Sequence, residues 1–195
     1  MRKSRSSREV TRARIVETAN ALFRRFGYTK TSMAEIAAEL KMSPANIYKF
    51  FPSKRALIEE GAECNMVEIQ EELERIRDGK GEAIGKLEKI VRYLYGYHRK
   101  IFSKEKQIYQ LVVDAYEEDW ECIRDFREFF LEVVASIVRE GVAGGEFSRA
   151  EASTAETLLD SLQWVVHPLL FPELDHKKVE GRVRAHIRFI EGALK

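Results

Sequence analysis

Cysteine and proline are scarce in this chain of 195 residues, and each scarcity narrows the possible fold classes. The two cysteines, Cys64 and Cys122, form neither a CxxC pair nor a zinc-ligand spacing, which argues against a disulfide-rich scaffold and against a zinc finger. We interpret both as small, reduced hydrophobic residues. Only four prolines interrupt the chain, and the polar–apolar alternation that is typical of strands is missing, so the pattern favours helices.

Long apolar runs are also missing, because no stretch of 18 apolar residues occurs. The N-terminal segment MRKSRSSREVTRARIVETANALF is rich in Arg and Ser, as transit peptides are, but Glu9 and Glu17 argue against transit. Glu17 and Asn20 also interrupt the apolar core that a secretory signal needs. We therefore expect a mature, soluble, cytoplasmic protein with a basic arm and no membrane partner.

Signatures of catalysis are missing as well. The sequence contains no GxSxG, no glycine-rich phosphate loop and no HExxH. One Glu-x-x-His occurs at Glu173 to His176, beside Pro172, but a di-iron bundle needs two such motifs on facing helices. We expect no enzyme, no metal and no cofactor. The alternative, a helical-bundle enzyme, would need a convergent set of titratable groups, and none is evident.

What the chain does have is a separation of charge. Residues 1–55 contain 13 Lys and Arg against 4 Asp and Glu, a net charge of +9, whereas the remainder contains 20 against 28, a net charge of −8. Hydrophobic residues make up 45% of the chain, enough for a real core. This asymmetry is typical of a segment that faces a polyanion, joined to a separate acidic body.

Helical periodicity covers nearly the whole chain, and we predict an all-α fold of about nine helices. The first helix should end at Phe26, where Gly27 can adopt the left-handed conformation. Capping boxes at Ser32–Glu35 and Ser148–Glu151 should each open a helix. Helices are expected at about residues 8–26, 32–40, 44–51, 53–77, 82–102, 104–117, 119–142, 148–166 and 175–194.

The third of these helices is very short. Ser43 can cap it, and Pro44 occupies its first position, where a missing N–H costs nothing. Two short helices joined by a tight turn make a helix-turn-helix, whose second helix presents its N-terminal end to the DNA major groove. Ile47 and the pair Phe50–Phe51 can pin this helix to its own domain.

The opposite side of the short helix carries side chains that suit base reading. Ala45 is small, Asn46 can bond adenine with both its donor and its acceptor, and Lys49 can reach a guanine edge or a phosphate. Pro44 can touch a thymine methyl. The alternative without DNA binding is that Ser32 and Ser43 only cap their helices and that Lys49 is an ordinary solvated lysine. Their coincidence with the basic segment favours DNA binding.

The stretch GYTKTSMAEIAAELKMSPANIYKFFPSKRALI resembles the N-terminal domain of the tetracycline-repressor (TetR) family of bacterial transcription regulators. The resemblance implies a helix-turn-helix domain over residues 1–52 and a helical effector-binding and dimerisation domain over residues 53–195. It also implies a homodimeric repressor that binds a palindromic operator and is released by a small-molecule effector. The DNA contacts that it implies, with the base-reading positions above, are Thr31, Ser32, Ser43, Pro44, Ala45, Asn46, Tyr48, Lys49 and Lys54.

The turn between the second and third helices departs from the family pattern. Relatives usually carry glycine where this chain has Lys41. A left-handed lysine would cost about 1–2 kcal/mol. We therefore expect this turn to be strained or differently shaped.

The acidic body is rich in aromatic residues, and each of them can be explained by core packing. As a group they suggest a pocket for a small molecule, with His98 and Trp164 as the central candidates. The candidate pocket residues are Tyr93, Tyr97, His98, Phe102, Tyr109, Trp120, Phe126 and Trp164. The alternative is a DNA-binding regulator that a partner protein controls without a small-molecule effector.

Two apolar stripes near the C-terminus suggest an interface between two copies of the chain. Each stripe is wide enough to serve a core and a second surface, and symmetric dimers are the commonest oligomers. The alternative is burial of both stripes within one subunit. The candidate dimer residues are Leu158, Leu159, Leu162, Val166, Val183, Ile187, Ile190 and Leu194.

Overall fold

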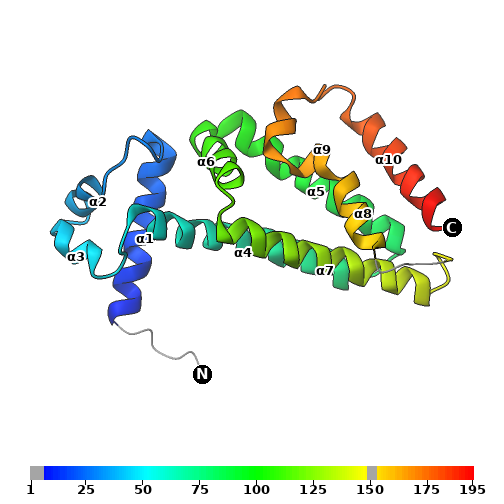
Figure 1. Cartoon of the computed structure of the whole chain (residues 1–195), viewed down its shortest axis with the longest axis horizontal. Coiled ribbons are helices and arrows are strands. Elements are labelled where there is room, and N and C mark those ends of the chain that lie inside the picture. Colours follow the sequence, from blue (N-terminus) through cyan, green and yellow to red (C-terminus); the bar gives the residue numbers. More distant parts are fainter. Residues whose placement is uncertain (1–6, 149–152) are drawn as a thin grey trace. The chain divides into compact units, whose positions relative to one another are not determined.

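The computed structural model describes residues 7–148 and 153–195, without the side chains of residues 63–65. These described residues form ten α-helices and one 3-10 helix, and no strand (Figure 1). The predicted all-α fold is therefore confirmed. The elements are α1 (Ser7–Phe26), α2 (Met33–Glu39), α3 (Pro44–Tyr48), α4 (Lys54–Asp78), α5 (Ala83–Lys104), α6 (Lys106–Glu117), α7 (Glu121–Ala143), α8 (Thr154–Ser161), α9 (Gln163–Val166), η1 (Pro168–Glu173) and α10 (Val179–Leu194).

The described residues divide into two compact units. The first, which we call the N-terminal unit, contains residues 7–67 and 105–122, and the second, the C-terminal unit, contains residues 68–104, 123–148 and 153–195. Helix α6 therefore packs with α1 although it follows α5 in the chain. The predicted functional division at residue 52 stays a prediction.

The N-terminal unit is built on side chains that are almost completely buried. Helix α1 buries one stripe that includes Ile15 and Phe23, and it ends at Gly27, whose φ of 90° is the left-handed conformation expected there. Other fully buried members come from α2, α3, the segment that joins α3 to α4, and α4, namely Ile36, Ile47, Phe51, Leu57 and Ile58. Cys122, in this unit, is buried, whereas the side chain of Cys64 lies outside the described set.

The core of the C-terminal unit lies between α5, α7 and α10. Lys86 on α5 is buried, and its Nζ donates to Glu140 Oε1 and Oε2 at 2.7 Å and to the Arg77 carbonyl at 2.8 Å. These bonds compensate the cost of burying an ammonium group. The start of α5 is thereby fastened to the end of α7, where Glu146 also accepts from the Ala83 N–H.

The C-terminal helices differ from the prediction in their limits. The helix expected over residues 148–166 is two helices, α8 and α9, with Leu162 as the joint, and the last helix begins at Val179 instead of near residue 175. Residues 149–151 of the predicted second capping box lie outside the described residues. Ser148 itself donates its N–H to the Leu194 carbonyl at 2.8 Å. Among the described helices, none is both long and apolar enough to cross a bilayer.

Candidate nucleic-acid interface

Helices α2 and α3 both begin at serine caps, as the sequence predicts. At α2 the Glu35 N–H donates to Ser32 Oγ at 3.2 Å, and the Ser32 N–H donates to Glu35 Oε2 at 2.7 Å, which completes the capping box. The hydrogen bonds from Ser32 lower the pKa of the Glu35 carboxyl. At α3 the Asn46 N–H donates to Ser43 Oγ at 3.3 Å, and Pro44 is the first helical residue.

The turn between α2 and α3 contains the expected left-handed lysine. Lys41 has a φ of 54°. The Met42 N–H donates to the Ala37 carbonyl at 2.8 Å, and the Lys41 N–H donates to the Ala38 carbonyl at 3.0 Å. This pair of bonds is the Schellman motif, which normally places glycine at the left-handed position. The turn thus has the same backbone shape that a glycine would give it, and Lys41 adopts the strained left-handed conformation.

One side of α3 is fixed to the unit and the other is open to solvent. Ile47 and Phe51 are fully buried. The predicted base-reading side is exposed at Pro44, Ala45 and Lys49 and half-buried at Asn46. Tyr48, at the end of the helix, is 50% exposed. The arrangement is that of a short helix that can enter a groove without leaving its own domain.

Arg12 is a positioning residue that the sequence analysis missed. Its guanidinium donates to the Phe50 carbonyl at 2.8 Å, forms an ion pair with Glu60, and lies 4.2 Å from the centroid of the Phe51 ring. Helix α1 is thereby joined to the end of α3 and to α4. No local pattern signals this role, because its partners lie 38 and 48 residues away in the chain.

Two of the predicted DNA contacts have partners inside the unit. Lys54 Nζ donates to the carbonyls of Tyr28 at 2.8 Å and Thr31 at 3.0 Å, and burial lowers the pKa of this ammonium group. Thr31 is buried, and its hydroxyl donates to the Gly27 carbonyl at 2.9 Å. The structure therefore does not present Thr31 at the surface. Both residues fasten the loop that leads from α1 to α2.

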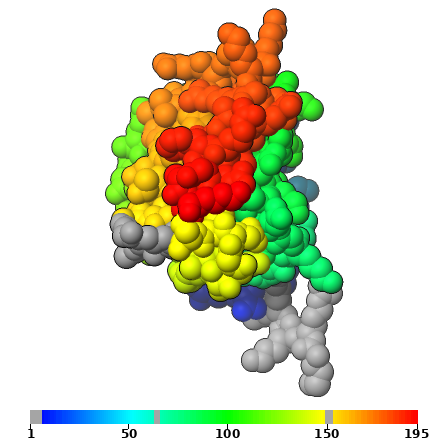
Figure 2. Space-filling view, turned by 90° about the vertical axis from the view of Figure 1, so that its right-hand side faces the viewer, coloured from blue at the N-terminus to red at the C-terminus, as the bar shows by residue number. Residues whose placement is uncertain are grey.

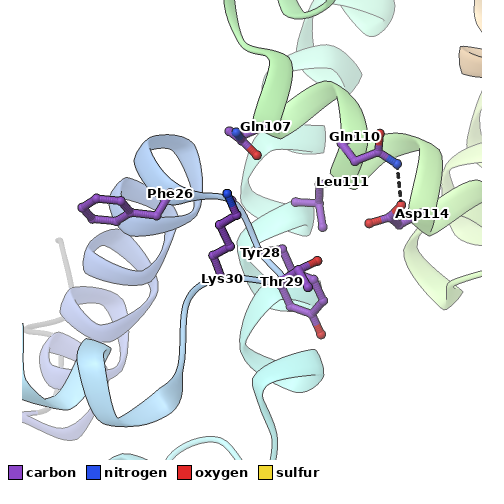
Figure 3. A pocket seen from close by; sticks show the side chains of 9 residues that line it. Phe26, Tyr28, Thr29, Lys30, Gln107, Gln110, Leu111 and Asp114 are labelled. Carbon is purple, nitrogen blue, oxygen red and sulfur yellow. Dashed lines mark hydrogen bonds between the residues drawn. The ribbon is translucent and has the colours of Figure 1, made fainter.

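The outer side of this loop forms a hollow of about 190 Å³ with α6 (Figure 3). The loop contributes residues 26–30, and α6 contributes one face, on which Gln110 Nε2 donates to Asp114 Oδ1 at 2.8 Å. Gln107 lies so close to Gly27 that a Cβ there would collide with its side-chain amide. Glycine is therefore favoured at this position by its φ of 90°, and a larger residue would also have to move the Gln107 amide. Helix α6 is packed directly against the loop that positions α2.

The predicted pocket residues fall into both units. Tyr109 and Trp120 belong to the N-terminal unit, where Trp120 packs edge-on against Tyr28. The remaining six lie in the C-terminal unit, where the structure brings His98 and Phe102 together around Phe171. Phe126 stacks on Phe130, on α7. Tyr93, Tyr97, Phe126 and Phe102 are partly buried against the hydrophobic core.

His98 and Trp164 share a property that sets them apart. Both side chains are buried, and in the described structure His98 Nδ1 and Trp164 Nε1 have no hydrogen-bond partner. Burial lowers the pKa of His98 to about 4, so the imidazole is neutral at pH 7. Buried polar atoms without partners are rare in native structures. The two side chains that the sequence placed at the centre of the predicted pocket are therefore the ones that, among the described residues, have a buried polar atom without a hydrogen-bond partner.

Most of the predicted dimer residues are buried within the chain itself, and their place in a dimer interface stays a prediction. Leu158, Leu159, Leu162, Val183, Ile187, Ile190 and Leu194 are buried within the chain, and Val166 is half-buried. One subunit therefore already covers most of both stripes, with Val166 as the half-buried member. On α10 the exposed apolar side chain is Phe189, which is 70% exposed. Figure 2 shows this helix (red) on the surface of the C-terminal unit, beside α5 (green).

Two family models match the chain. Residues 15–60 match "Bacterial regulatory proteins, tetR family", and residues 83–186 match "Tetracyclin repressor-like, C-terminal domain". The chain belongs to the TetR family. Within this family, α2, the Lys41 turn and α3 are the DNA-binding helix-turn-helix.

Individual TetR relatives agree with this assignment. The HTH-type transcriptional regulator YuxN of Bacillus subtilis (strain 168) is 52% identical over 44 residues, which are 23% of this chain and only 15% of that protein. A TetR/AcrR regulator from Thermobifida fusca YX-ER1 has a TM-score of 0.66 at 22% identity, covering 95% of this chain and 98% of its own. FadR from Bacillus subtilis, solved with stearoyl-CoA, has a TM-score of 0.64 at 16% identity, covering 94% and 99%. The two structural likenesses show the TetR fold alone.

Proposed function

We propose that this TetR-family chain is a homodimeric repressor that binds a palindromic DNA operator through α3 and is released from it by a small-molecule effector. The observation that carries the proposal is the α2–turn–α3 arrangement. Its reading side is exposed at Pro44, Ala45 and Lys49, while Ile47 and Phe51 hold it to a rigid core. A short helix with this division of faces can place small and polar side chains against base edges.

The roles of the DNA contacts follow from their surroundings. Asn46, Lys49 and Pro44 are proposed to read bases, and Tyr48 to contact a phosphate from the exposed end of α3. Ser32 and Ser43 stand at helix N-termini, where backbone N–H groups favour an anion. Lys54 uses two of its three N–H donors on backbone carbonyls, which leaves one for a phosphate oxygen.

A small-molecule effector is proposed for the C-terminal unit. The unpartnered buried atoms of His98 and Trp164 support it, because a bound molecule can supply hydrogen bonds that the chain does not. The structural relative FadR was solved with stearoyl-CoA, so the same fold accommodates a ligand there. Control by a partner protein alone would leave these buried atoms unexplained.

Dimerisation is proposed through the exposed side of α10. Phe189 projects from that side, between the small residues Ala185 and Gly192. A twofold mate can cover this side with the same surface, and a closed dimer sets two reading helices about 34–36 Å apart or a multiple of that spacing.

Selection of binding sites from random double-stranded DNA tests the proposed function. We expect enrichment of an inverted repeat. Asn46→Ala should weaken binding to the enriched site by about 1–3 kcal/mol and leave binding to random DNA nearly unchanged. Glu39→Ala, on the exposed end of α2, serves as the matched control. Recovery of no preferred sequence would refute operator binding, and an equal loss on both DNAs would remove Asn46 from base reading.

A further inference from the structure

Phe171 is the centre of an aromatic cluster in the C-terminal unit. Its ring is 1% exposed and comes from η1. The ring centroids of Tyr95, His98, Phe102 and His176 lie 5.8, 6.0, 5.6 and 5.1 Å from that of Phe171. We call these five residues the Phe171 cluster. One phenylalanine ring therefore occupies a site whose neighbours are four other rings.

The segment that carries Phe171 is poorly suited to a permanent core. η1 is a 3-10 helix of six residues with proline at Pro168 and Pro172, and such helices have weaker hydrogen-bond geometry than α-helices. Leu169 and Leu170 are 44% and 42% exposed, so the segment leaves two leucines partly in solvent while it buries Pro168 and the Phe171 ring. Phe171 thus resembles a removable plug more than a member of a packed helix face.

The plug leaves one neighbour unsatisfied. His98 Nδ1 is buried without a hydrogen-bond partner, and a phenylalanine ring cannot provide one. The other polar pair of the cluster is complete, because Tyr95 Oη lies 3.1 Å from His176 Nδ1. A ring of the same size that carried a hydroxyl would satisfy His98 in either tautomer, since a hydroxyl both donates and accepts.

The charge of the cluster limits the ligand further. The Phe171 cluster contains no lysine or arginine, and the buried ammonium of the same unit, on Lys86, is already bound by Glu140. Burying a carboxylate without a cation is costly. The site therefore suits a neutral ring and disfavours an acid.

We propose that the effector is a neutral phenol-like molecule, which displaces Phe171 from the cluster and hydrogen-bonds His98 Nδ1. This inference rests on the proposed function, because it names the chemical class of the effector and the residue that recognises it. The ring of the ligand takes the place of the phenylalanine ring against Tyr95, Phe102 and His176.

Three probes of similar size compare a neutral phenol, an apolar ring and a carboxylate: 4-methylphenol, toluene and 4-methylbenzoate. Their binding is measured by calorimetric titration and by the shift of the unfolding midpoint. In the wild-type protein we expect 4-methylphenol to bind at least tenfold more tightly than toluene, and 4-methylbenzoate not to bind. Phe171→Ala removes the plug and should tighten 4-methylphenol binding. His98→Phe should abolish the preference for the phenol over toluene, whereas the control His186→Phe should keep it.

Several results would overturn the inference. They are equal binding of phenol and toluene to the wild type, a preference for 4-methylbenzoate or for stearoyl-CoA, or an unchanged preference in His98→Phe. If Phe171→Ala does not fold, the wild type and His98→Phe decide. The probes are titrated without DNA, and operator binding is measured separately. A protein that binds DNA but no phenol refutes this inference alone, and one that binds phenol but no DNA refutes the repressor.

Discussion

Replacing Lys41 by glycine should relieve backbone strain in the N-terminal unit but change its stability little, because this lysine adopts the left-handed conformation at a φ of 54°. For an L-residue that conformation costs about 1–2 kcal/mol, and glycine avoids it. Two losses oppose the gain. Glycine has more conformational freedom to lose on folding, about 0.5–1 kcal/mol, and the ammonium at the C-terminal end of α2 contributes about 0.3–1 kcal/mol through the helix dipole. At the midpoints of these ranges the gain and the two losses nearly cancel, so the net change relative to lysine is close to zero, about 0.1 kcal/mol.

A comparison of Lys41→Gly with Lys41→Ala isolates the backbone. Both variants lose the charge, but only alanine keeps a Cβ in the left-handed conformation. We expect the glycine variant to be more stable than the alanine variant by about 1 kcal/mol. At Lys30, which is exposed and is not among the residues with positive φ, the order should reverse, because glycine there brings only its entropic cost.

The assay can be confined to the unit that contains the turn. Each unit has one tryptophan, Trp120 in the N-terminal unit and Trp164 in the C-terminal unit. In a Trp164→Phe background, urea unfolding followed by fluorescence reports on the N-terminal unit. Equal midpoints for Lys41→Gly and Lys41→Ala would show that residue 41 is not left-handed in solution. The assignment of a Schellman motif at the end of α2 would then be refuted.

Three further predictions concern DNA contact, assembly and pH. If the third donor of Lys54 binds a phosphate, Lys54→Ala should weaken binding to all DNA sequences alike and reduce the salt slope by about one. Weaker operator binding with an unchanged salt slope would mean that Lys54 acts only through its bonds to the Tyr28 and Thr31 carbonyls. Phe189→Glu should convert the dimer to a monomer, as measured by sedimentation, and leave the helical content intact. The control Val67→Glu, at another exposed apolar position, should leave the dimer intact. A wild-type protein that is monomeric at micromolar concentration would refute the dimer. Burial lowers the pKa of His98 to about 4 in the folded protein, against roughly 6.5 in the unfolded chain. The free energy of unfolding should therefore be greatest above pH 6.5 and fall by on the order of 3 kcal/mol as the pH drops toward 4. Urea unfolding of His98→Phe should lack this pH dependence.

Local signals predicted the parts of the fold that depend on neighbouring residues. The caps at Ser32 and Ser43 and the end of α1 at Gly27 follow from side-chain chemistry within a few positions, whereas the left-handed turn at Lys41 was expected from the family resemblance. A hydroxyl that satisfies a backbone N–H, or a residue that must adopt a positive φ, needs no knowledge of the tertiary structure.

The apolar stripes show where this reasoning fails. Periodicity identified Val183, Ile187 and Ile190 as a buried face, and they are buried. The pattern does not say what covers the face, because a partner subunit and a helix of the same chain remove the same apolar area from water. The exposed Phe189, two residues from Ile187, lies outside the stripe and was missed for that reason.

Side chains with distant partners were equally hard to foresee. The chemistry of Lys54 suits a phosphate as well as a pair of carbonyls, and only the tertiary structure places the Tyr28 and Thr31 carbonyls beside it. Phe171 is not among the predicted pocket residues, because this ring comes from a proline-flanked 3-10 segment and not from a periodic helix. Its signal was present in the sequence as an apolar run, PLLFP, too short to form a helix of its own.

The path of the chain suggests how an effector at the Phe171 cluster would act on DNA binding. The cluster uses His98 and Phe102, which lie in the last turns of α5, and α5 ends at Lys104. The chain then enters α6, which belongs to the N-terminal unit and packs through Gln107 against Gly27. Gly27 begins the loop that Thr31 and Lys54 fasten and that ends at the cap of α2. On our proposal, displacement of Phe171 would perturb a helix end that is covalently continuous with the support of the reading helix, and we expect a small shift there to suffice, because packed interfaces switch between discrete arrangements.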